Sequence, residues 1–175
     1  MNNHTTTIIN FINQIGIPCM PATLTNDTFL PGIDIRNGTI WYDNEKMKQP
    51  GDLLHEAGHV AVLPPEDRKT SSSPDNINGD LQAGGAEMAA IAWSWAALKH
   101  LNIPPEIIFH ADGYKSGAAD LIRNFTNGQY LGHHLLAWMG MTCISEHENS
   151  EKLYPAMTHW LRQIGRASCR ERVSS

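Results

Sequence analysis

Two histidines and a glutamate lie within the five-residue stretch His55-Glu56-Ala57-Gly58-His59. In an α-helix, residues four apart point about 40° apart around the axis, so His55 and His59 would face the same side and share one metal ion. Glu56 would point about 60° from His59, within reach of a water near that ion. The chemistry that this spacing indicates is metal-assisted hydrolysis.

The pattern H-E-x-x-H is typical of zinc metallopeptidases when it lies on a helix. The flanking residues predict that helix over 51–63. Gly51-Asp52 supplies a start signal, apolar residues follow, and Pro64-Pro65 ends the pattern. The alternative interpretation is a surface helix with two solvated histidines.

A third ligand is expected on the next long helix, which is predicted over 80–100. Glu87 is the only acidic residue between Asp80 and Glu106, and its neighbours are Ala, Met and Trp. Burying a carboxylate among such residues is unfavourable unless a cation neutralises it. We therefore predict Glu87 as the third ligand, 28 residues after His59. An exposed helix glutamate is the alternative.

Small residues on this second helix would let the two helices share a metal. Gly84 and Gly85 each cost about 1 kcal/mol relative to Ala in a helix interior, which usually has a packing or functional reason. We expect the second helix to approach Ala57-Gly58 closely through its small residues Ala83, Gly84, Ala86 and Ala90.

Three protein ligands leave a fourth position for water, as in catalytic zinc sites. We therefore expect one Zn²⁺ per chain on His55, His59 and Glu87, with Glu56 as the catalytic base. Hydrolysis also needs a group that stabilises the developing oxyanion. The sequence offers several without choosing among them: Tyr114, His133 and His134, and also Tyr130 and His110. Neighbours on a helix point about 100° apart, so the two adjacent histidines cannot both face one site.

The composition argues against two classes of partner. The chain has 13 Lys and Arg against 18 Asp and Glu, a net charge of −5, and phosphate binding needs a basic face. We therefore expect no direct nucleic-acid binding. No run approaches the 18 apolar residues of a membrane span, and no basic residue precedes Arg36. We expect no membrane insertion, no secretory signal and a cytoplasmic location.

Residues 164–175 resemble a translated sequencing-adapter read-through rather than native protein, so we exclude them. They contain three Arg and one Glu, and without them the net charge becomes −7. The remaining cysteines, Cys19 and Cys143, indicate neither a disulfide framework nor a thiolate zinc site. At about 160 residues a chain buries roughly 70% of its unfolded surface, so 1–163 is expected to form a single domain.

The hydrophobic periodicity predicts a mostly α-helical chain with a small β-hairpin, an α+β fold. The strongest β signal is Ile33–Arg36 and Thr39–Tyr42 around Asn37-Gly38, which suits a two-residue type I′ turn. Segments 17–32 and 64–80 are predicted to be loops, the second either gating the site or passive. Besides the two helices above, helices are expected over 5–14, 104–109, 115–125, 130–143 and 155–163.

The order of these elements resembles the core of the ImmA/IrrE family of small metallopeptidases. The similarity covers roughly residues 5–110. The chain departs from the family at two positions: it has Ala89 where the family commonly has Asn or Asp, and Ile91 where the family commonly has Phe. It rests on the segments Ile33 to Tyr42, His55 to His59, Glu87-Met88-Ala89-Ala90-Ile91-Ala92 and Leu101-Asn102-Ile103-Pro104-Pro105-Glu106.

The resemblance implies a zincin-like, gluzincin-type core, in which the H-E-x-x-H helix packs on a second, Glu-bearing helix. It assigns His55, His59 and Glu87 to zinc and Glu56 to base catalysis. It also implies a protein or peptide substrate, such as a DNA-binding repressor in a stress or mobile-element circuit. The expected activity is zinc-dependent peptide-bond hydrolysis. Two alternatives stay open: a non-catalytic, zinc-braced binding or immunity module, and a helical domain without metal.

Overall fold

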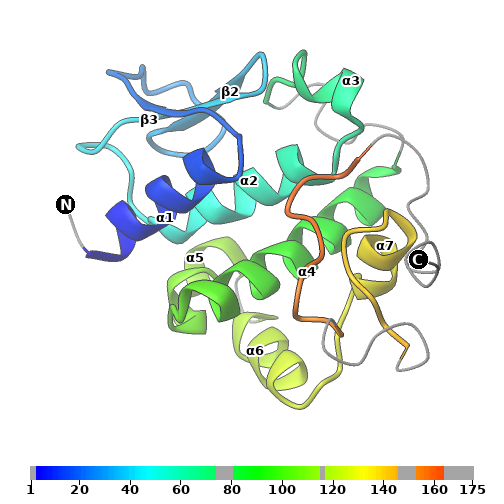
Figure 1. The fold of residues 1–175 in the computed structure, drawn as a ribbon. Coiled ribbons are helices and arrows are strands. Elements are labelled where there is room, and N and C mark those ends of the chain that lie inside the picture. The colour runs from blue at the N-terminus through cyan, green and yellow to red at the C-terminus, as the bar shows by residue number, and fades with distance from the viewer. Residues whose placement is uncertain (1–2, 74–80, 115–116, 146–152, 164–175) are drawn as a thin grey trace.

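Helix α2 (Gly51–Val62) carries the H-E-x-x-H motif and lies in the middle of the fold. The computed structural model describes residues 3–73, 81–114, 117–145 and 153–163. A small sheet lies on one side of α2, and helix α4 (Ala83–Leu101) crosses on the other side (Figure 1). Helix α1 (Asn3–Gln14) packs against α2 and the sheet. The motif helix is therefore buried on most sides.

The sheet has three strands, β1 (Cys19–Pro21), β2 (Ile33–Arg36) and β3 (Thr39–Tyr42), in the order β1-β3-β2. Strands β2 and β3 form the predicted antiparallel hairpin, and Asn37 and Gly38 both have positive φ, 51° and 71°. This is the backbone that a type I′ turn requires.

Strand β1 lies in the segment 17–32, where a loop was predicted. It pairs in parallel with β3, and Ile40 donates a backbone hydrogen bond of 2.8 Å to Pro18. The Asn13 side chain also accepts from the Cys19 N–H at 3.0 Å. A three-residue strand that depends on such distant partners leaves no periodic signal in its own sequence. Cys19 is buried and is a free thiol, and burial raises its pKa to about 12.

The two central helices approach most closely at Gly58. A Cβ atom added there would lie 3.0 Å from the Ala90 carbonyl oxygen and 3.3 Å from the Ser94 hydroxyl. Ala86 and Ala90 are fully buried, as the expected small-residue contact requires. The expectation was wrong for Ala83, which is exposed, and for Gly84, because among the described residues no atom beyond its chain neighbours and its own helix backbone lies within 4 Å of a Cβ added there. The close contact thus uses a glycine of α2, and α4 is open at Gly84.

The helices found within the predicted ranges 104–109 and 130–143 are shorter than predicted. In the range 130–143, Gly132 (φ 81°) immediately precedes the observed helix His133–Trp138 and Gly140 (φ 73°) lies two residues after it, so two glycines with positive φ limit this helix. A short helix also lies in the predicted loop 64–80, of which residues 74–80 are outside the described part. The elements are α3 (Pro65–Arg68), the 3-10 helix η1 (Pro105–Ile107), α5 (Ala111–Tyr114), α6 (Ala118–Thr126) and α7 (His133–Trp138).

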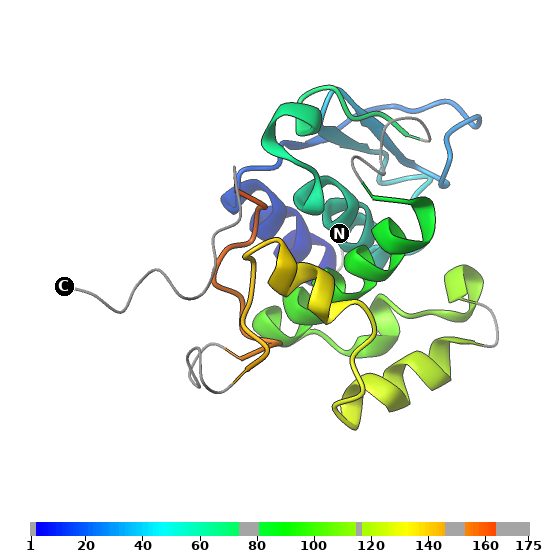
Figure 2. The same cartoon turned by 90° about the vertical axis from the view of Figure 1, so that its right-hand side faces the viewer.

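The predicted helix over 155–163 is wrong. Residues 153–163, the C-terminal strap, instead run across α4 and α2 (Figures 1 and 2). Trp93 donates its indole N–H to the Trp160 carbonyl at 2.9 Å, and the Arg162 N–H donates to the Ala61 carbonyl at 3.0 Å. These distant partners replace the i to i−4 hydrogen bonds of a helix.

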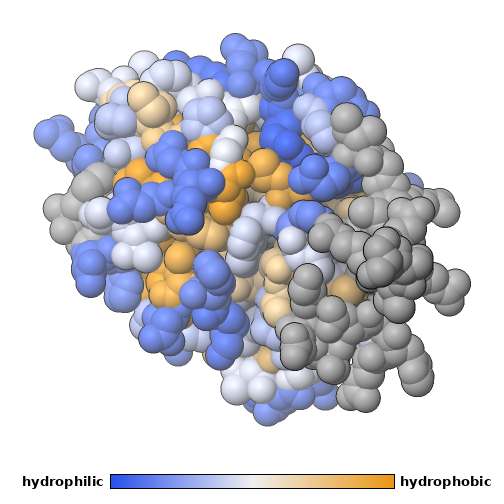
Figure 3. Space-filling model, viewed as in Figure 1, coloured by the Kyte–Doolittle hydropathy of each residue, from blue (hydrophilic) through white to orange (hydrophobic). Residues whose placement is uncertain are grey.

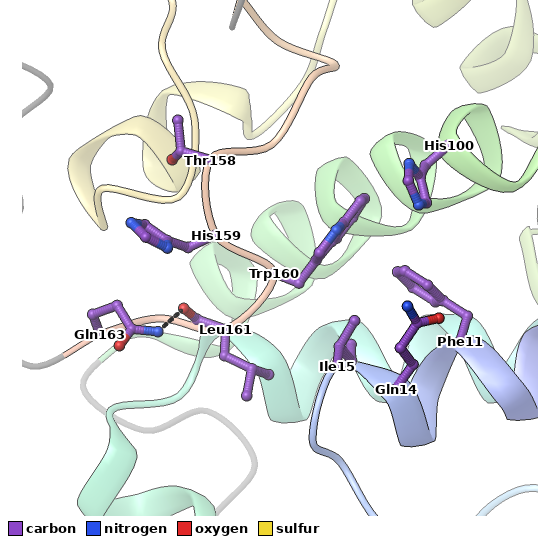
Figure 4. A pocket seen from close by; sticks show the side chains of 9 residues that line it. All are labelled: Phe11, Gln14, Ile15, His100, Thr158, His159, Trp160, Leu161 and Gln163. Atoms are coloured by element: carbon purple, nitrogen blue, oxygen red, sulfur yellow. Dashed lines mark hydrogen bonds between the residues drawn. The ribbon is translucent and has the colours of Figure 1, made fainter.

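The strap also packs on α1 at Phe11. Its Trp160 ring packs against the rings of Phe11 and His100, with centroids 4.9 and 5.2 Å away (Figure 4). Arg162 in turn lies over the Trp138 ring at 5.2 Å. Such aromatic contacts stabilise a non-helical segment by burial rather than by backbone regularity.

The surface is mixed in character. In the coloured part of the face seen in Figure 3, hydrophilic residues are widely spread and hydrophobic residues gather toward the middle. Within the described ranges, no helix has the length and apolar character needed to cross a membrane.

The helix contact at Gly58 predicts opposite effects for two glycine substitutions. Gly58→Val should lower the free energy of unfolding by about 1–3 kcal/mol, because its side chain would meet the backbone of α4. Gly84→Ala, in open space on α4, should raise that free energy by up to about 1 kcal/mol. Urea unfolding of the metal-free variants, followed by circular dichroism, measures both. Equal effects of the two substitutions would contradict the contact.

Candidate metal centre

Three side chains from α2 and α4 converge on one point. His55 Nε2 and His59 Nε2 lie 3.1 Å apart, and Glu87 Oε2 lies 3.2 Å from His59 Nε2 and 3.5 Å from His55 Nε2. Within the described part of the chain, no other group of three His, Cys, Asp or Glu brings ligand atoms this close together. The three residues are close enough to bind a metal ion.

Helix periodicity and one close contact produce this convergence. His55 and His59 are one turn apart on α2 and therefore share a face, with ring centroids 4.8 Å apart. On α4, Glu87 lies one turn before Ala90, which touches Gly58. The contact that brings the backbones together thus also carries the Glu87 side chain to the two histidines.

The spacing of the three atoms fits a tetrahedral ion. Zinc bonds of 2.0–2.2 Å to nitrogen and oxygen imply ligand atoms about 3.3–3.6 Å apart, close to the three distances found here. Two imidazole nitrogens at 3.1 Å also repel each other if both present lone pairs, and a shared cation removes that repulsion. The donor set and its geometry therefore fit the metal that the sequence predicted.

Glu87 is more exposed than the sequence argument assumed. Its side chain is 47% exposed, so the expected burial among apolar residues is wrong, although the expected position beside the histidines holds. Hydrogen bonds from His55 and His59 hold the pKa of Glu87 well below its usual range. The carboxylate is therefore ionised, as a metal ligand must be.

Glu56 has the opposite environment. Only 4% of this residue is exposed, and burial raises its pKa to about 7, opposed by His59 and assisted by the charges of Asp52 and Glu87. A carboxyl group with a pKa near neutrality can both accept and return a proton at physiological pH. Two glutamates on neighbouring helices thus have pKa values shifted in opposite directions, which is common at catalytic sites.

Tyr114 lies at the site, where its hydroxyl contacts a ring nitrogen of His55. Its hydroxyl lies 2.9 Å from His55 Nδ1, and the two rings meet edge to face at 87°. Burial raises the pKa of Tyr114, so the hydroxyl stays protonated. The contact is with the ring nitrogen of His55 that does not face Glu87. Tyr114, a candidate for oxyanion stabilisation, is therefore placed at the outer ring nitrogen of His55.

A second polar contact, between His110 and Asp52, also joins the segment 110–114 to α2. His110 Nε2 lies 2.7 Å from Asp52 Oδ1, and the Gly113 N–H donates to His110 Nδ1 at 3.1 Å. Because Nδ1 accepts, the proton of His110 is on Nε2 and is donated to Asp52. Asp52 was not expected to contribute to the site. The available signal was the spacing: His110 and Tyr114 are one turn apart, as are Asp52 and His55.

The other oxyanion candidates lie elsewhere in the described structure. His133 Nδ1 donates to the Tyr130 carbonyl at 2.8 Å, and its ring packs against Tyr130 and Tyr154. Burial lowers the pKa of His133. His134 is exposed and contacts the His133 ring. Among the described residues, neither histidine belongs to the cluster of His55, His59 and Glu87.

Comparison of the chain with protein-family models, with curated proteins and with solved structures finds no match. The resemblance to the ImmA/IrrE family therefore stays a prediction from the sequence, and the site is interpreted from the chemistry of its own residues.

The buried Glu56 predicts a pH-dependent gain in stability on its removal. The pKa of Glu56 is raised on folding, so the folded protein binds its proton more tightly than the unfolded chain does. The stability that this proton contributes is fully present below about pH 4.5 and is lost as the pH rises toward 7. In the metal-free protein, Glu56→Gln should therefore raise the free energy of unfolding by about 1–3 kcal/mol at pH 8 and by much less at pH 5.

Urea unfolding of both proteins at the two pH values measures this difference. Glu66→Gln is the control, because Glu66 is an exposed glutamate of α3. A gain from Glu56→Gln that is the same at both pH values would contradict the raised pKa.

Proposed function

We propose that this protein is a zinc-dependent peptidase that hydrolyses a peptide bond in a protein partner. The observation that carries the proposal is the convergence of His55, His59 and Glu87 within 3.5 Å of one another, with the buried Glu56 adjacent on the same helix. We interpret the packing of α2 on α4, beside a small sheet, as a zincin-like core.

The donor set supports a transition metal such as zinc over Mg²⁺ and Ca²⁺. Two imidazoles and one carboxylate are the ligands of catalytic zinc in peptidases, whereas Mg²⁺ and Ca²⁺ prefer all-oxygen sites. The chain would supply three ligands and leave the remaining position to water or substrate. One ion per chain is expected.

The chemistry divides between the ion and the chain. Zinc, when bound, polarises a carbonyl oxygen and lowers the pKa of a water molecule. Glu56 takes the proton of the attacking water and passes it to the leaving amine. Glu87 and the two histidines remain ligands and transfer no proton.

The exposure of the site supports a polymeric substrate. The Glu87 side chain is 47% exposed, and α4 carries no side chain at Gly84 and Gly85, which precede Glu87 by one turn or less. A polypeptide could therefore approach the ion along this part of α4. A DNA-binding repressor is the partner that the ImmA/IrrE resemblance suggests.

Metal binding should depend on all three ligands. The purified protein is expected to hold about one zinc ion per chain, and His59→Ala and Glu87→Ala should each lose it or bind it at least 100-fold more weakly. His134→Ala is the matched control, because this histidine is exposed and away from the cluster. Elemental mass spectrometry with a chelator competition measures both quantities. Full zinc content in His59→Ala would exclude this site.

Catalysis should depend on Glu56 without affecting the metal. Glu56→Gln should lower the rate of peptide-bond cleavage by at least 100-fold while zinc content stays at one per chain. Zinc-loaded protein is incubated with a proteome-derived peptide library, and new amino termini are counted by mass spectrometry. If both proteins bind zinc and neither produces new termini, a non-catalytic, zinc-braced binding module becomes the better account.

A further inference from the structure

Both ring nitrogens of His55 have partners, and these partners belong to different parts of the molecule. Its Nε2 lies in the cluster, 3.1 Å from His59 Nε2 and 3.5 Å from Glu87 Oε2. Its Nδ1 lies 2.9 Å from the Tyr114 hydroxyl, which α5 supplies from a segment 59 residues away. His55 is thus the connection between α5 and the candidate metal centre.

The proton of a neutral imidazole can be on only one nitrogen. A histidine that binds a metal through Nε2 carries its proton on Nδ1 and donates it to an outer group. In that tautomer Tyr114 accepts the hydrogen bond. A hydroxyl can also rotate and donate to Nδ1, which leaves the proton on Nε2, facing Glu87. Tyr114 can therefore serve His55 with the metal and without it.

We propose that Tyr114 is a positioning residue for the metal: its hydroxyl holds the His55 ring in place with the proton on Nδ1, and so sets the affinity for zinc. This inference rests on the zinc site proposed above. Tyr114 does not contact the ion in this role, because it acts on the nitrogen that does not face Glu87.

Helix α5 is anchored so that the hydroxyl stays in place. His110 directly precedes α5 and donates to Asp52 at 2.7 Å. Asp52 lies on α2, one turn before His55. The Tyr114 ring also packs against Phe109, with centroids 5.2 Å apart. Two polar contacts, each one turn from the other, therefore hold α5 against the ligand-bearing face of α2.

The second histidine ligand has no such support. His59 Nδ1 is the only buried side-chain nitrogen or oxygen without a hydrogen bond within the described residues. An outer partner orients a ligand ring and increases its basicity, and losing one typically weakens metal binding 10–100-fold. With no outer partner on His59, the contribution of Tyr114 at His55 should be large.

The test is Zn²⁺ affinity, measured by competition with a chromophoric chelator. Tyr114→Phe should weaken Zn²⁺ binding 10–100-fold, because it removes the hydroxyl and keeps the ring. Tyr154→Phe is the control: it removes a buried hydroxyl that donates to the Ala92 carbonyl of α4 at 2.8 Å, without contact to the cluster. The control should bind Zn²⁺ within about threefold of the parent.

A double-mutant cycle shows whether Tyr114 acts through His55. Adding Tyr114→Phe to His55→Ala should change the residual Zn²⁺ affinity by less than about twofold, whereas adding it to Glu87→Ala should keep most of its effect. A general loss of stability would instead weaken binding in both backgrounds. Equal losses in the two backgrounds would overturn the inference.

A measurement on the parent protein does not depend on how the variants fold. Long-range ¹H–¹⁵N spectra of the zinc-loaded protein should show His55 protonated on Nδ1, with this proton exchanging more slowly than that of His59. A His55 protonated on Nε2, or Tyr114→Phe binding within threefold of the parent, would overturn the inference alone. A parent that binds no Zn²⁺ would overturn the proposed function, and this inference with it.

Discussion

The backbone contact between α2 and α4 is the constraint on which the candidate site depends. A side chain at Gly58 would push the Ala90 backbone away, and Glu87 lies one turn from Ala90. A displacement of about 1 Å would take the carboxylate out of reach of a shared ion, since ligand distances tolerate about 0.2 Å. The strap, α1 and the sheet all pack around these two helices and hold them at this separation.

The same packing brings two imidazole nitrogens together and buries the Glu56 carboxyl group, and neither arrangement by itself favours the metal-free fold. Two imidazoles meet at 3.1 Å, and a glutamate with 4% exposure lies beside them. A buried carboxylate lowers stability, and two imidazole nitrogens at this distance lower it when both present lone pairs, whereas a bound cation would offset both effects. Unfavourable local electrostatics at one buried point support a functional interpretation.

Much of this arrangement could be predicted from local sequence. Helix periodicity placed His55 and His59 on one face, Asn37-Gly38 identified the hairpin, and an isolated acidic residue identified Glu87. The prediction did not extend to features set by distant partners. The strap has a helix-like apolar spacing, but its backbone bonds to α2, and α5 is a four-residue helix whose role comes from contacts with Asp52 and His55. Gly84 looked like a packing residue because spacing alone does not show which face of α4 is covered.

The most direct test of the central claim is X-ray absorption at the zinc edge of the zinc-loaded protein. A three-residue site predicts four nitrogen or oxygen neighbours at about 2.0–2.1 Å, with the outer scattering of two imidazoles, and the loss of one imidazole in His59→Ala. Six oxygen neighbours without imidazole scattering would mean that the ion is held elsewhere on the surface. That result would contradict a metal centre on α2 and α4.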